Sequence, residues 1–418
     1  MKTTTMSRRQ LLGSAAGLAL GVGTGGGVRA AAPGDWDALA RSYDVAPDVV
    51  NLENAYFGIM ARPVLEAYQR NVDLLNRANS HYLRTRFDRT EVEAIRARLA
   101  AHTGVGVSEL AITRNATEAL QNLIEGYRLL RPDDTLMMGN LDYDIMQDAM
   151  RGVAQRLGTA LATVRLPEPA TRQNVIDAYE DALRRHPRTR LLLLTHVSNR
   201  TGLVTPVAEI VRLARSRGVD VIVDIAQSWG QLDFRIPDLG ADFVGANLHK
   251  WIGAPLCSGF MVVKEERLRD IAPRSGNSLY PDDDIRARVH AGTMDVAAVM
   301  TVPAALDFHG GIGLAERAAR LRALRDRWVH GVLDLPAVQV LTPEDPAMYG
   351  AVTSFRLRGK TSFEENAALA RRLLEEFGIF TVARTGPVGG ACIRVTPSWF
   401  TRFEDLDRLA AAIKVLAA

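Results

Sequence analysis

The stretch ANLHKWIGAP, residues 246–255, places Lys250 between His249 and Trp251, directly before a turn rich in Gly and Pro. A lysine taken alone is usually a solvated surface residue. This lysine follows the short apolar run of residues 241–248, which has the composition of a buried strand. The fold and the chemistry therefore depend on what the chain places around an amine at the end of a strand.

Strand-like and helix-like segments alternate through the part of the chain that contains this stretch. Short runs dense in Val, Leu and Ile predict strands at residues 110–113, 135–140, 190–197, 219–226 and 241–248. Apolar residues at helical spacing predict helices between them, at residues 116–130 and 207–218. This βαβ rhythm predicts an α/β fold, with a mostly parallel sheet covered by helices on both faces.

The rhythm changes after about residue 300. Long helices rich in Arg and Ala are predicted at residues 313–331 and 362–378, and they alternate with strands near residues 351–357 and 392–396. We interpret this part as a smaller C-terminal α+β domain.

The first 32 residues have the pattern of an export signal. Arg8 and Arg9 precede a weakly apolar run rich in Gly and Ala, and three small residues follow at positions 30–32. A basic start, an apolar middle and a small-residue cleavage site predict a signal peptide, and the paired arginines indicate the twin-arginine type. The sequence therefore predicts export to the periplasm by the twin-arginine machinery.

The charge of the remaining chain gives no sign of a nucleic-acid partner. The full chain has 51 basic and 48 acidic residues. The first 32 residues carry four basic residues and no acid, so the remainder has 47 basic and 48 acidic residues and is nearly neutral. No later segment has the apolar length of a membrane span.

The two cysteines, Cys257 and Cys392, give no disulfide framework and no ligand spacing for zinc, so we expect no metal site. A single bridge between them stays open as an alternative. Two small, mostly buried thiols are the favoured interpretation.

Asn115, Ala116 and Thr117 lie where a predicted strand leads into a predicted helix. Free N–H groups at a helix N-terminus bind phosphate, and a threonine hydroxyl adds a donor. The alternative is simple helix capping, with Asn115 as the cap and Glu118 three residues later.

Four further side chains follow predicted strands. Tyr143 could stack on a flat ring, or pack as a loop tyrosine. Asn199 lies in a turn where its amide can donate, although turns favour Asn for their own reasons. Asp224 ends a strongly apolar strand, where a carboxylate is costly unless it is paired, and Gln227 follows it.

One cofactor, pyridoxal 5'-phosphate, would use all of these groups. Its phosphate matches Ala116, Thr117 and His249, its phenolic oxygen matches Asn199 and Gln227, its ring face matches Tyr143, its ring nitrogen matches Asp224, and its aldehyde matches Lys250. The carboxylate of Asp224 would keep the ring nitrogen protonated and the ring an electron sink. Lys250 would then be the catalytic residue, because its freed amine is the natural general base at the substrate Cα.

The order of the motifs NATEA, DYD, SNRTG, DIAQ and HKWIGAP resembles the class V aminotransferases, and within them the isopenicillin N epimerase-like branch. The resemblance covers roughly residues 45–415. It implies the PLP-dependent transferase fold of type I, an amino-acid substrate and a homodimer. It also implies a division into an N-terminal arm at residues 33–60, a large PLP-binding domain at residues 61–295 and a small domain at residues 296–418 that the arm completes.

The resemblance assigns three further residues. In NLENAYFG, Asn54 belongs to a loop that borders the substrate. Thr293, after Gly292, would touch the cofactor phosphate of the neighbouring subunit, and Arg394 would grip the substrate carboxylate. The chain departs from the family at Asn247, where many members have a small hydroxyl residue near the phosphate.

The resemblance leaves the reaction open. An aminotransferase is the favoured interpretation, with an epimerase or a lyase of the isopenicillin N epimerase-like type as alternatives. Neither cysteine lies on a loop of the small domain, which disfavours cysteine desulfuration. A catalytically silent exported binding protein is the alternative from another class. A nucleotide-binding oxidoreductase would need a Gly-rich fingerprint after a first strand, and the chain after residue 32 has none.

Overall fold

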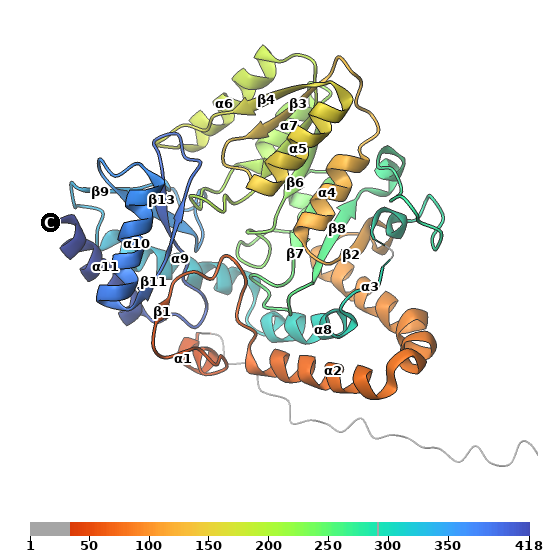
Figure 1. The fold of residues 1–418 in the computed structure, drawn as a ribbon, viewed down its shortest axis with the longest axis horizontal. Helices are drawn as coiled ribbons and strands as arrows, with labels where there is room; N and C mark the ends of the chain where they lie inside the picture. The colour runs from red at the N-terminus through yellow and green to blue at the C-terminus, as the bar shows by residue number, and fades with distance from the viewer. Residues whose placement is uncertain (1–33, 291) are drawn as a thin grey trace, which may run out of the picture.

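The computed structural model describes residues 34–290 and 292–418, so the predicted signal peptide lies outside the described residues. Its centre is a seven-stranded sheet (Figure 1). The strand order across the sheet is β2 (Leu110–Thr113), β8 (Gly259–Val263), β7 (Phe243–Asn247), β6 (Asp220–Asp224), β5 (Thr189–Thr195), β3 (Thr135–Gly139) and β4 (Ala160–Val164). The five strands predicted between residues 110 and 248 all belong to it.

Five strands of this sheet, from β7 to β4, are parallel, as predicted. β8 breaks the pattern, because it pairs antiparallel with both β7 and β2. The chain from β7 to β8 is too short for a crossover helix, so it returns as a hairpin. Lys250 lies in this connection.

Helices cover both faces of the sheet. They are α3 (Val92–Thr103), α4 (Ala116–Gly126), α5 (Asp144–Leu157), α6 (Arg172–Arg185) and α7 (Val207–Arg215). Alternate residues of β5 enter two different cores: Leu191 and Leu193 pack with α4 and α5, whereas Leu192 and Leu194 pack with α6 and α7. This is the pattern of a strand that is buried on both faces, and it explains why the strand sequences are continuously apolar.

A second, antiparallel sheet forms the small α+β part. Its order is β12 (Val382–Arg384), β13 (Cys392–Val395), β10 (Thr353–Leu357) and β9 (Val338–Val340). The helices of this part are α9 (Leu314–His330), α10 (Phe363–Phe377) and α11 (Phe403–Ala417). Figure 1 shows them grouped with β9 and β13 at one end of the molecule, where the C-terminus also lies.

The N-terminal segment runs along this second part. After α1 (Trp36–Ala40), β1 (Val50–Asn51) pairs in parallel with β11 (Ile379–Phe380), and Glu53 forms a bridge with Thr396. The chain then enters α2 (Arg62–Tyr82), a π-helical stretch (Leu83–Glu91) and α3. The segment from residue 50 to residue 54 is therefore held by strands that follow it by more than 300 positions in the sequence.

α8 (Val296–Gly310) packs against α2 and α3 (Figure 1). The remaining short helices are 3-10 turns at Val107–Glu109, Ile236–Leu239, Glu265–Asp270 and Ile285–Arg288. Within residues 34–290 and 292–418, no single helix has the length and apolar content needed to cross a membrane. Together α8 and α9 meet that test only as a pair bent by 76°.

Candidate active site

A cavity of about 500 Å³ opens at the carboxyl ends of the central parallel strands. Thr195, Asp224 and Asn247, the last residues of β5, β6 and β7, all line it. This edge is where open α/β sheets bind ligands, and the volume is in the usual range of roughly 300–1,000 Å³ for small-molecule sites. Nine of the eleven residues predicted for the site line the cavity: Ala116, Thr117, Tyr143, Asn199, Asp224, Gln227, His249, Lys250 and Arg394.

Lys250 is half-buried in the cavity wall. Burial lowers the pKa of its amine to about 8; the negative charge of Asp224 opposes this effect and the charge of Arg394 adds to it. A lowered pKa leaves a larger neutral fraction of the amine near neutral pH, which a nucleophile or a general base requires.

The N-terminal arm touches the backbone of this lysine. The N–H of Gly58 donates to the carbonyl of His249 at 2.8 Å, and a Cβ on Gly58 would lie 2.2 Å from the carbonyl oxygen of Lys250. Only a glycine allows the arm to approach so closely. The arm is therefore a wall of the site as well as part of the second sheet.

Asp224 is buried at the base of the cavity, where its Oδ1 accepts from the N–H of Ala226 at 2.8 Å. Its other oxygen makes no hydrogen bond within the described residues. Burial raises the pKa of this carboxyl, and the hydrogen bond from Ala226 and the charge of Lys250 oppose the rise. Within the described residues this carboxylate accepts no hydrogen bond from a cationic group, and the protonated ring nitrogen of pyridoxal phosphate would supply one.

Asn199 and Gln227 differ in the hydrogen bonds that their side-chain amides already make. The Oδ1 of Asn199 is buried with no hydrogen-bond partner within the described residues. The Nε2 of Gln227 donates to the carbonyl of Ala55 at 2.8 Å, and its Oε1 accepts from Trp251 at 3.1 Å. The Nδ2 of Asn199 also makes no hydrogen bond within the described residues, so this amide keeps a donor for a ligand, whereas Gln227 is mostly committed to the arm and to the lysine turn.

Asn247 changes the part of the cavity that was predicted to bind the cofactor phosphate. Asn115 caps α4 by accepting from the N–H of Glu118 at 2.8 Å, so Asn115 is the cap, as the alternative predicted. Glu118 does not complete a capping box, because its carboxylate accepts from the N–H of Arg114 at 2.7 Å. The N–H of Ala116 donates to the Oδ1 of Asn247 at 2.8 Å, which takes one of the donors expected for the phosphate. The Nδ2 of Asn247 makes no hydrogen bond within residues 34–290 and 292–418, and it is the donor that this residue offers in place of a hydroxyl.

The imidazole of His249 is held by the backbone carbonyl of Ser258. Its Nδ1 lies 3.3 Å from the carbonyl oxygen of Ser258, and burial together with Lys250 lowers its pKa to about 4. The imidazole is therefore neutral near pH 7 when no ligand is bound. A phosphate beside it would raise the pKa, because a neighbouring anion favours the imidazolium.

Arg394 is buried on β13 and makes an ion pair that the sequence did not predict. Its Nε lies 3.2 Å from Glu53 of the arm, its Nη2 contacts the same carboxylate, and its Nη1 donates to the carbonyl of Asn199 at 2.6 Å. Arg384 of β12 also lines the cavity and contacts Glu53 at 3.5 Å. Glu53 in NLENAYFG was the one sequence feature that could have indicated this cluster. The arm and β13 are too far apart in the chain for their pairing to be predicted from the sequence.

Two predicted residues lie outside the cavity. The Nδ2 of Asn54 donates to the carbonyls of Thr396 at 2.9 Å and Asn51 at 3.1 Å, so this side chain fastens the arm to the second sheet and does not face the cavity. Its neighbours Ala55, Tyr56 and Phe57 line the cavity instead. Thr293 is exposed and does not line the cavity.

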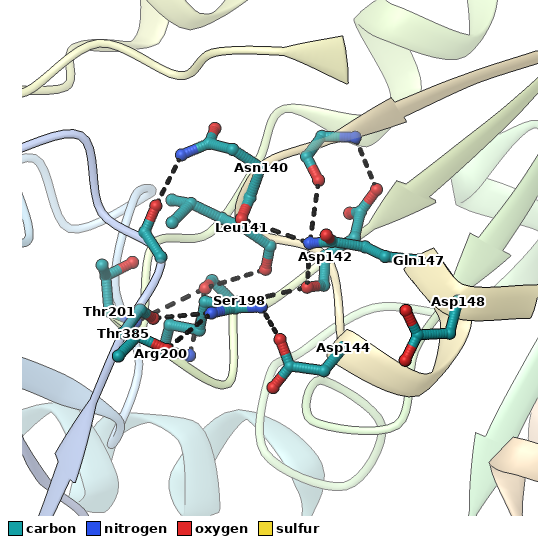
Figure 2. Close-up of polar contacts among 12 residues, drawn as sticks. Asn140, Leu141, Asp142, Asp144, Gln147, Asp148, Ser198, Arg200, Thr201 and Thr385 are labelled. Atoms are coloured by element: carbon teal, nitrogen blue, oxygen red, sulfur yellow. Dashed lines mark hydrogen bonds and ion pairs between the residues drawn. The ribbon is translucent and has the colours of Figure 1, made fainter. Parts of the chain in front are cut away.

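The loop that carries Tyr143 is fixed by a buried polar network (Figure 2). Asp142 accepts from the N–H groups of Gly139 at 2.6 Å and Thr195 at 3.1 Å. Arg200, next to Asn199, pairs with Asp144 and donates to the carbonyl of Thr385 at 2.7 Å. The ends of β3 and β5 are thereby tied to each other and to the hairpin between β12 and β13.

The cysteine prediction was wrong for Cys257, which is exposed, lies on the rim of the cavity and has a positive φ of 64°. It follows the tight turn after Lys250, where the chain must reverse into β8. Cys392 is buried as expected, and burial raises the pKa of its thiol to about 11.

The sequence profile described as "Aminotransferase class-V" matches residues 60–401. The isopenicillin N epimerase of Streptomyces clavuligerus is 30% identical over 403 residues, which covers 91% of this chain and 98% of the relative. The isopenicillin N epimerase of Amycolatopsis lactamdurans is 28% identical over 407 residues, with the same coverage.

Solved structures agree on the fold. The apo cysteine desulfurase of Thermococcus onnurineus NA1 superposes with a TM-score of 0.77 at 20% identity, covering 91% of this chain and 98% of that one. A variant of the protein C-DES with glycine covalently linked to its PLP cofactor superposes with a TM-score of 0.75 at 21% identity, covering 87% and 96%.

The fold and the cavity define a PLP-dependent enzyme of fold type I, as predicted. The chain belongs to the class V aminotransferase family, and its cofactor is pyridoxal 5'-phosphate. The predicted likeness to isopenicillin N epimerases is confirmed by the two relatives.

Proposed function

We propose that this protein is an exported enzyme that acts at the Cα of an amino acid or an amino-acid-containing metabolite, and that its reaction is transamination. The observation that carries the action at Cα is the amine of Lys250, which lies in the same cavity as the carboxylate of Asp224 and whose pKa is lowered to about 8 by burial. The pair provides a base for the Cα proton and an anion for the ring nitrogen of the cofactor.

The other residues of the cavity would orient the reactants. When bound, the cofactor withdraws electrons from Cα, and this is what makes the Cα proton acidic. Lys250 would hold the cofactor aldehyde and, once displaced by the substrate amine, would move the proton at Cα. Asn199 would donate to the phenolic oxygen, while Asn247, Thr117 and His249 would surround the phosphate.

Epimerisation is the second candidate, and the names of two relatives that are each covered over 98% of their length favour it. It shares every step up to the loss of the Cα proton and differs in where a proton returns. Transamination would need Lys250 to pass the proton on to the cofactor, whereas epimerisation would need a proton to be delivered to the opposite face of Cα. A lyase would instead lose a substituent from the side chain.

An amino-acid panel separates these reactions. We expect the absorbance of the purified, cofactor-loaded protein to convert to that of pyridoxamine phosphate with at least one amino acid, and a keto acid to form in equal amount. Epimerisation would instead give exchange of the Cα proton in heavy water with no keto acid. Absence of any bound cofactor would support a silent binding protein and contradict both enzymatic proposals.

We propose export from the sequence of residues 1–32. Replacing both Arg8 and Arg9 by Lys is expected to retain the full-length protein in the cytoplasm, because the twin-arginine machinery reads the arginine pair. The unchanged protein should appear in the periplasm without its first ~30 residues. Fractionation followed by N-terminal sequencing checks both results, and normal export of the double variant would contradict this assignment.

We also propose a homodimer in which Thr293 of one subunit reaches the cofactor phosphate of the other. The exposed position of Thr293, outside the cavity of its own chain, supports this arrangement. An obligate two-fold interface buries a large area, so a dimer should persist at working concentration. A fully active monomer in analytical sedimentation would contradict the proposal.

A further inference from the structure

Three large apolar side chains are exposed at the mouth of the cavity. Tyr56 and Phe57 belong to the N-terminal arm, and Leu256 belongs to the turn that follows Lys250. All three line the cavity, yet the exposed fractions are 71% for Tyr56, 45% for Phe57 and 54% for Leu256. Single exposed apolar side chains are ordinary, but three that border one ligand cavity indicate an interaction site. We call these three residues the apolar rim.

Hydrogen bonds of the backbone fix the aromatic pair of the apolar rim at the cavity. The carbonyl of Ala55 accepts from the Nε2 of Gln227 at 2.8 Å, and the N–H of Gly58 donates to the carbonyl of His249 at 2.8 Å. The two aromatic residues lie between these anchors, and their rings pack edge to face with centroids 5.8 Å apart. A surface held in this way binds a ligand without the entropy cost of ordering a loop.

Hydrogen bonds also fix the turn that carries Leu256. The Oγ of Ser258 donates to the carbonyl of Pro255 at 2.5 Å, and the N–H of Leu248 donates to the carbonyl of Ser258 at 3.0 Å. Pro255 and Ser258 are buried, whereas the side chain of Leu256 between them is exposed. The turn thus presents an apolar side chain at the cavity, six positions after Lys250.

The charges of the cavity favour an apolar substrate side chain over an acidic one. The carboxylate of Glu53 contacts both Arg384 and Arg394, so these three groups have one positive charge in excess. The α-carboxylate of an amino acid would offset that charge. The other basic side chains that line the cavity, Lys250 and His249, are assigned to the cofactor. A carboxylate on the substrate side chain would then lack a counter-charge, which is costly in a buried site.

A basic substrate side chain is disfavoured for the same reason. The acids that line the cavity are Asp144 and Asp224. Asp144 pairs with Arg200, and Asp224 is assigned to the ring nitrogen of the cofactor. An apolar group needs no counter-charge, and it would bury surface that the apolar rim leaves in contact with water.

We propose that the apolar rim binds the side chain of the substrate, and that the substrate is an amino acid whose side chain is bulky and apolar, such as an aromatic one. This inference rests on the proposed function, because it names the substrate class of the same site. The apolar rim is continuous with the cavity that contains Lys250. A substrate whose Cα lies near that amine would therefore extend its side chain toward the mouth of the cavity.

Three probes without a proton on Cα test the proposal on the cofactor-loaded protein. 2-Aminoisobutyrate, α-methylphenylalanine and α-methylglutamate share the amine and the α-carboxylate, and they differ in a methyl, a benzyl or a carboxyethyl group. The two chiral probes are tested as separate enantiomers. Titration of each probe against the cofactor absorbance gives a dissociation constant, and the ratio of two constants reports the side chain alone. Because no Cα proton is present, the ratio does not depend on whether the reaction is transamination or epimerisation.

We expect one enantiomer of α-methylphenylalanine to bind roughly 10- to 100-fold more tightly than 2-aminoisobutyrate, the gain from burying one aromatic side chain. Phe57→Ala and Leu256→Ala should each weaken α-methylphenylalanine more than 2-aminoisobutyrate, and so reduce this ratio by roughly 3- to 10-fold. The matched control is Phe363→Ala, because Phe363 on α10 is 47% exposed and does not line the cavity. It should leave every dissociation constant unchanged.

A ratio near one in the unchanged protein, or tighter binding of α-methylglutamate than of α-methylphenylalanine, would overturn the proposal. An unchanged ratio in both rim variants would overturn it as well. Sedimentation of the same variants tests the other occupant, because a monomeric Phe57→Ala would assign the apolar rim to the subunit interface and likewise overturn the proposal. If none of the three probes changes the absorbance of the unchanged protein, the proposed function fails instead.

Discussion

Lys250→Ala is expected to abolish turnover, with a loss of roughly 10⁴-fold or more in kcat. The variant removes both the amine that holds the cofactor aldehyde and the base that moves the proton at Cα. No other described lysine lines the cavity, so no neighbouring amine replaces it. Turnover with the best amino acid of the panel, measured beside the cofactor absorbance, checks the result.

The matched control for this variant is Lys264→Ala. Lys264 lies just after β8, is partly exposed and pairs with Glu109 at 3.1 Å, away from the cavity. It should retain the activity and the cofactor of the unchanged protein. Full activity in Lys250→Ala, or an equal loss in the control, would contradict the role assigned to Lys250.

Asp224→Ala is expected to lose roughly 10²- to 10³-fold in kcat, the usual effect of removing one preorganised electrostatic contact from an active site. Without the carboxylate, the ring nitrogen loses the anion that keeps it protonated, and the ring becomes a poorer electron sink. Asp224→Asn is the matched variant, because it keeps the shape of the side chain and removes the charge. Both variants should lose activity to a similar extent.

The stability of the cofactor-free protein separates this loss from misfolding. Burial raises the pKa of Asp224, so the ionised carboxylate destabilises the cofactor-free fold as pH rises through that pKa. The Asn variant removes this penalty, and its thermal midpoint without cofactor at neutral pH should equal or exceed that of the unchanged protein. A lower midpoint together with lost activity would mean that Asp224 acts through the fold.

Local patterns predicted the parts of this fold that depend on short stretches of sequence. Continuous apolar runs identified β5, β6 and β7, because a strand buried on both faces has no polar alternation. The polar residues at the ends of these strands then identified much of the cavity. β8 was not predicted as a strand, and its antiparallel direction has no local signal, because the composition of a short apolar strand does not encode its direction.

The missed parts of the site depend on contacts between distant segments. Glu53 and Arg394 are separated by 341 positions, and only the pairing of the arm with the second sheet brings them together. The contact between Ala116 and Asn247 spans 131 positions and joins a helix start to a strand end. No local sequence pattern indicates either pair. The role of each residue was therefore predicted from its sequence neighbours alone.

The approach of Gly58 to Lys250 makes the wall of the active site part of a segment whose strand pairing is only two residues long. Residues 50–58 bury Leu52 and Ala55, but they pair with other strands only through β1 and the bridge of Glu53 within the described residues, whereas the inner strands of the central sheet are paired on both sides. Segments with few contacts open first when a protein fluctuates. Fraying from this end would therefore dismantle the ligand site while the central sheet was still intact, so that cofactor release, protease sensitivity and loss of activity would precede global unfolding.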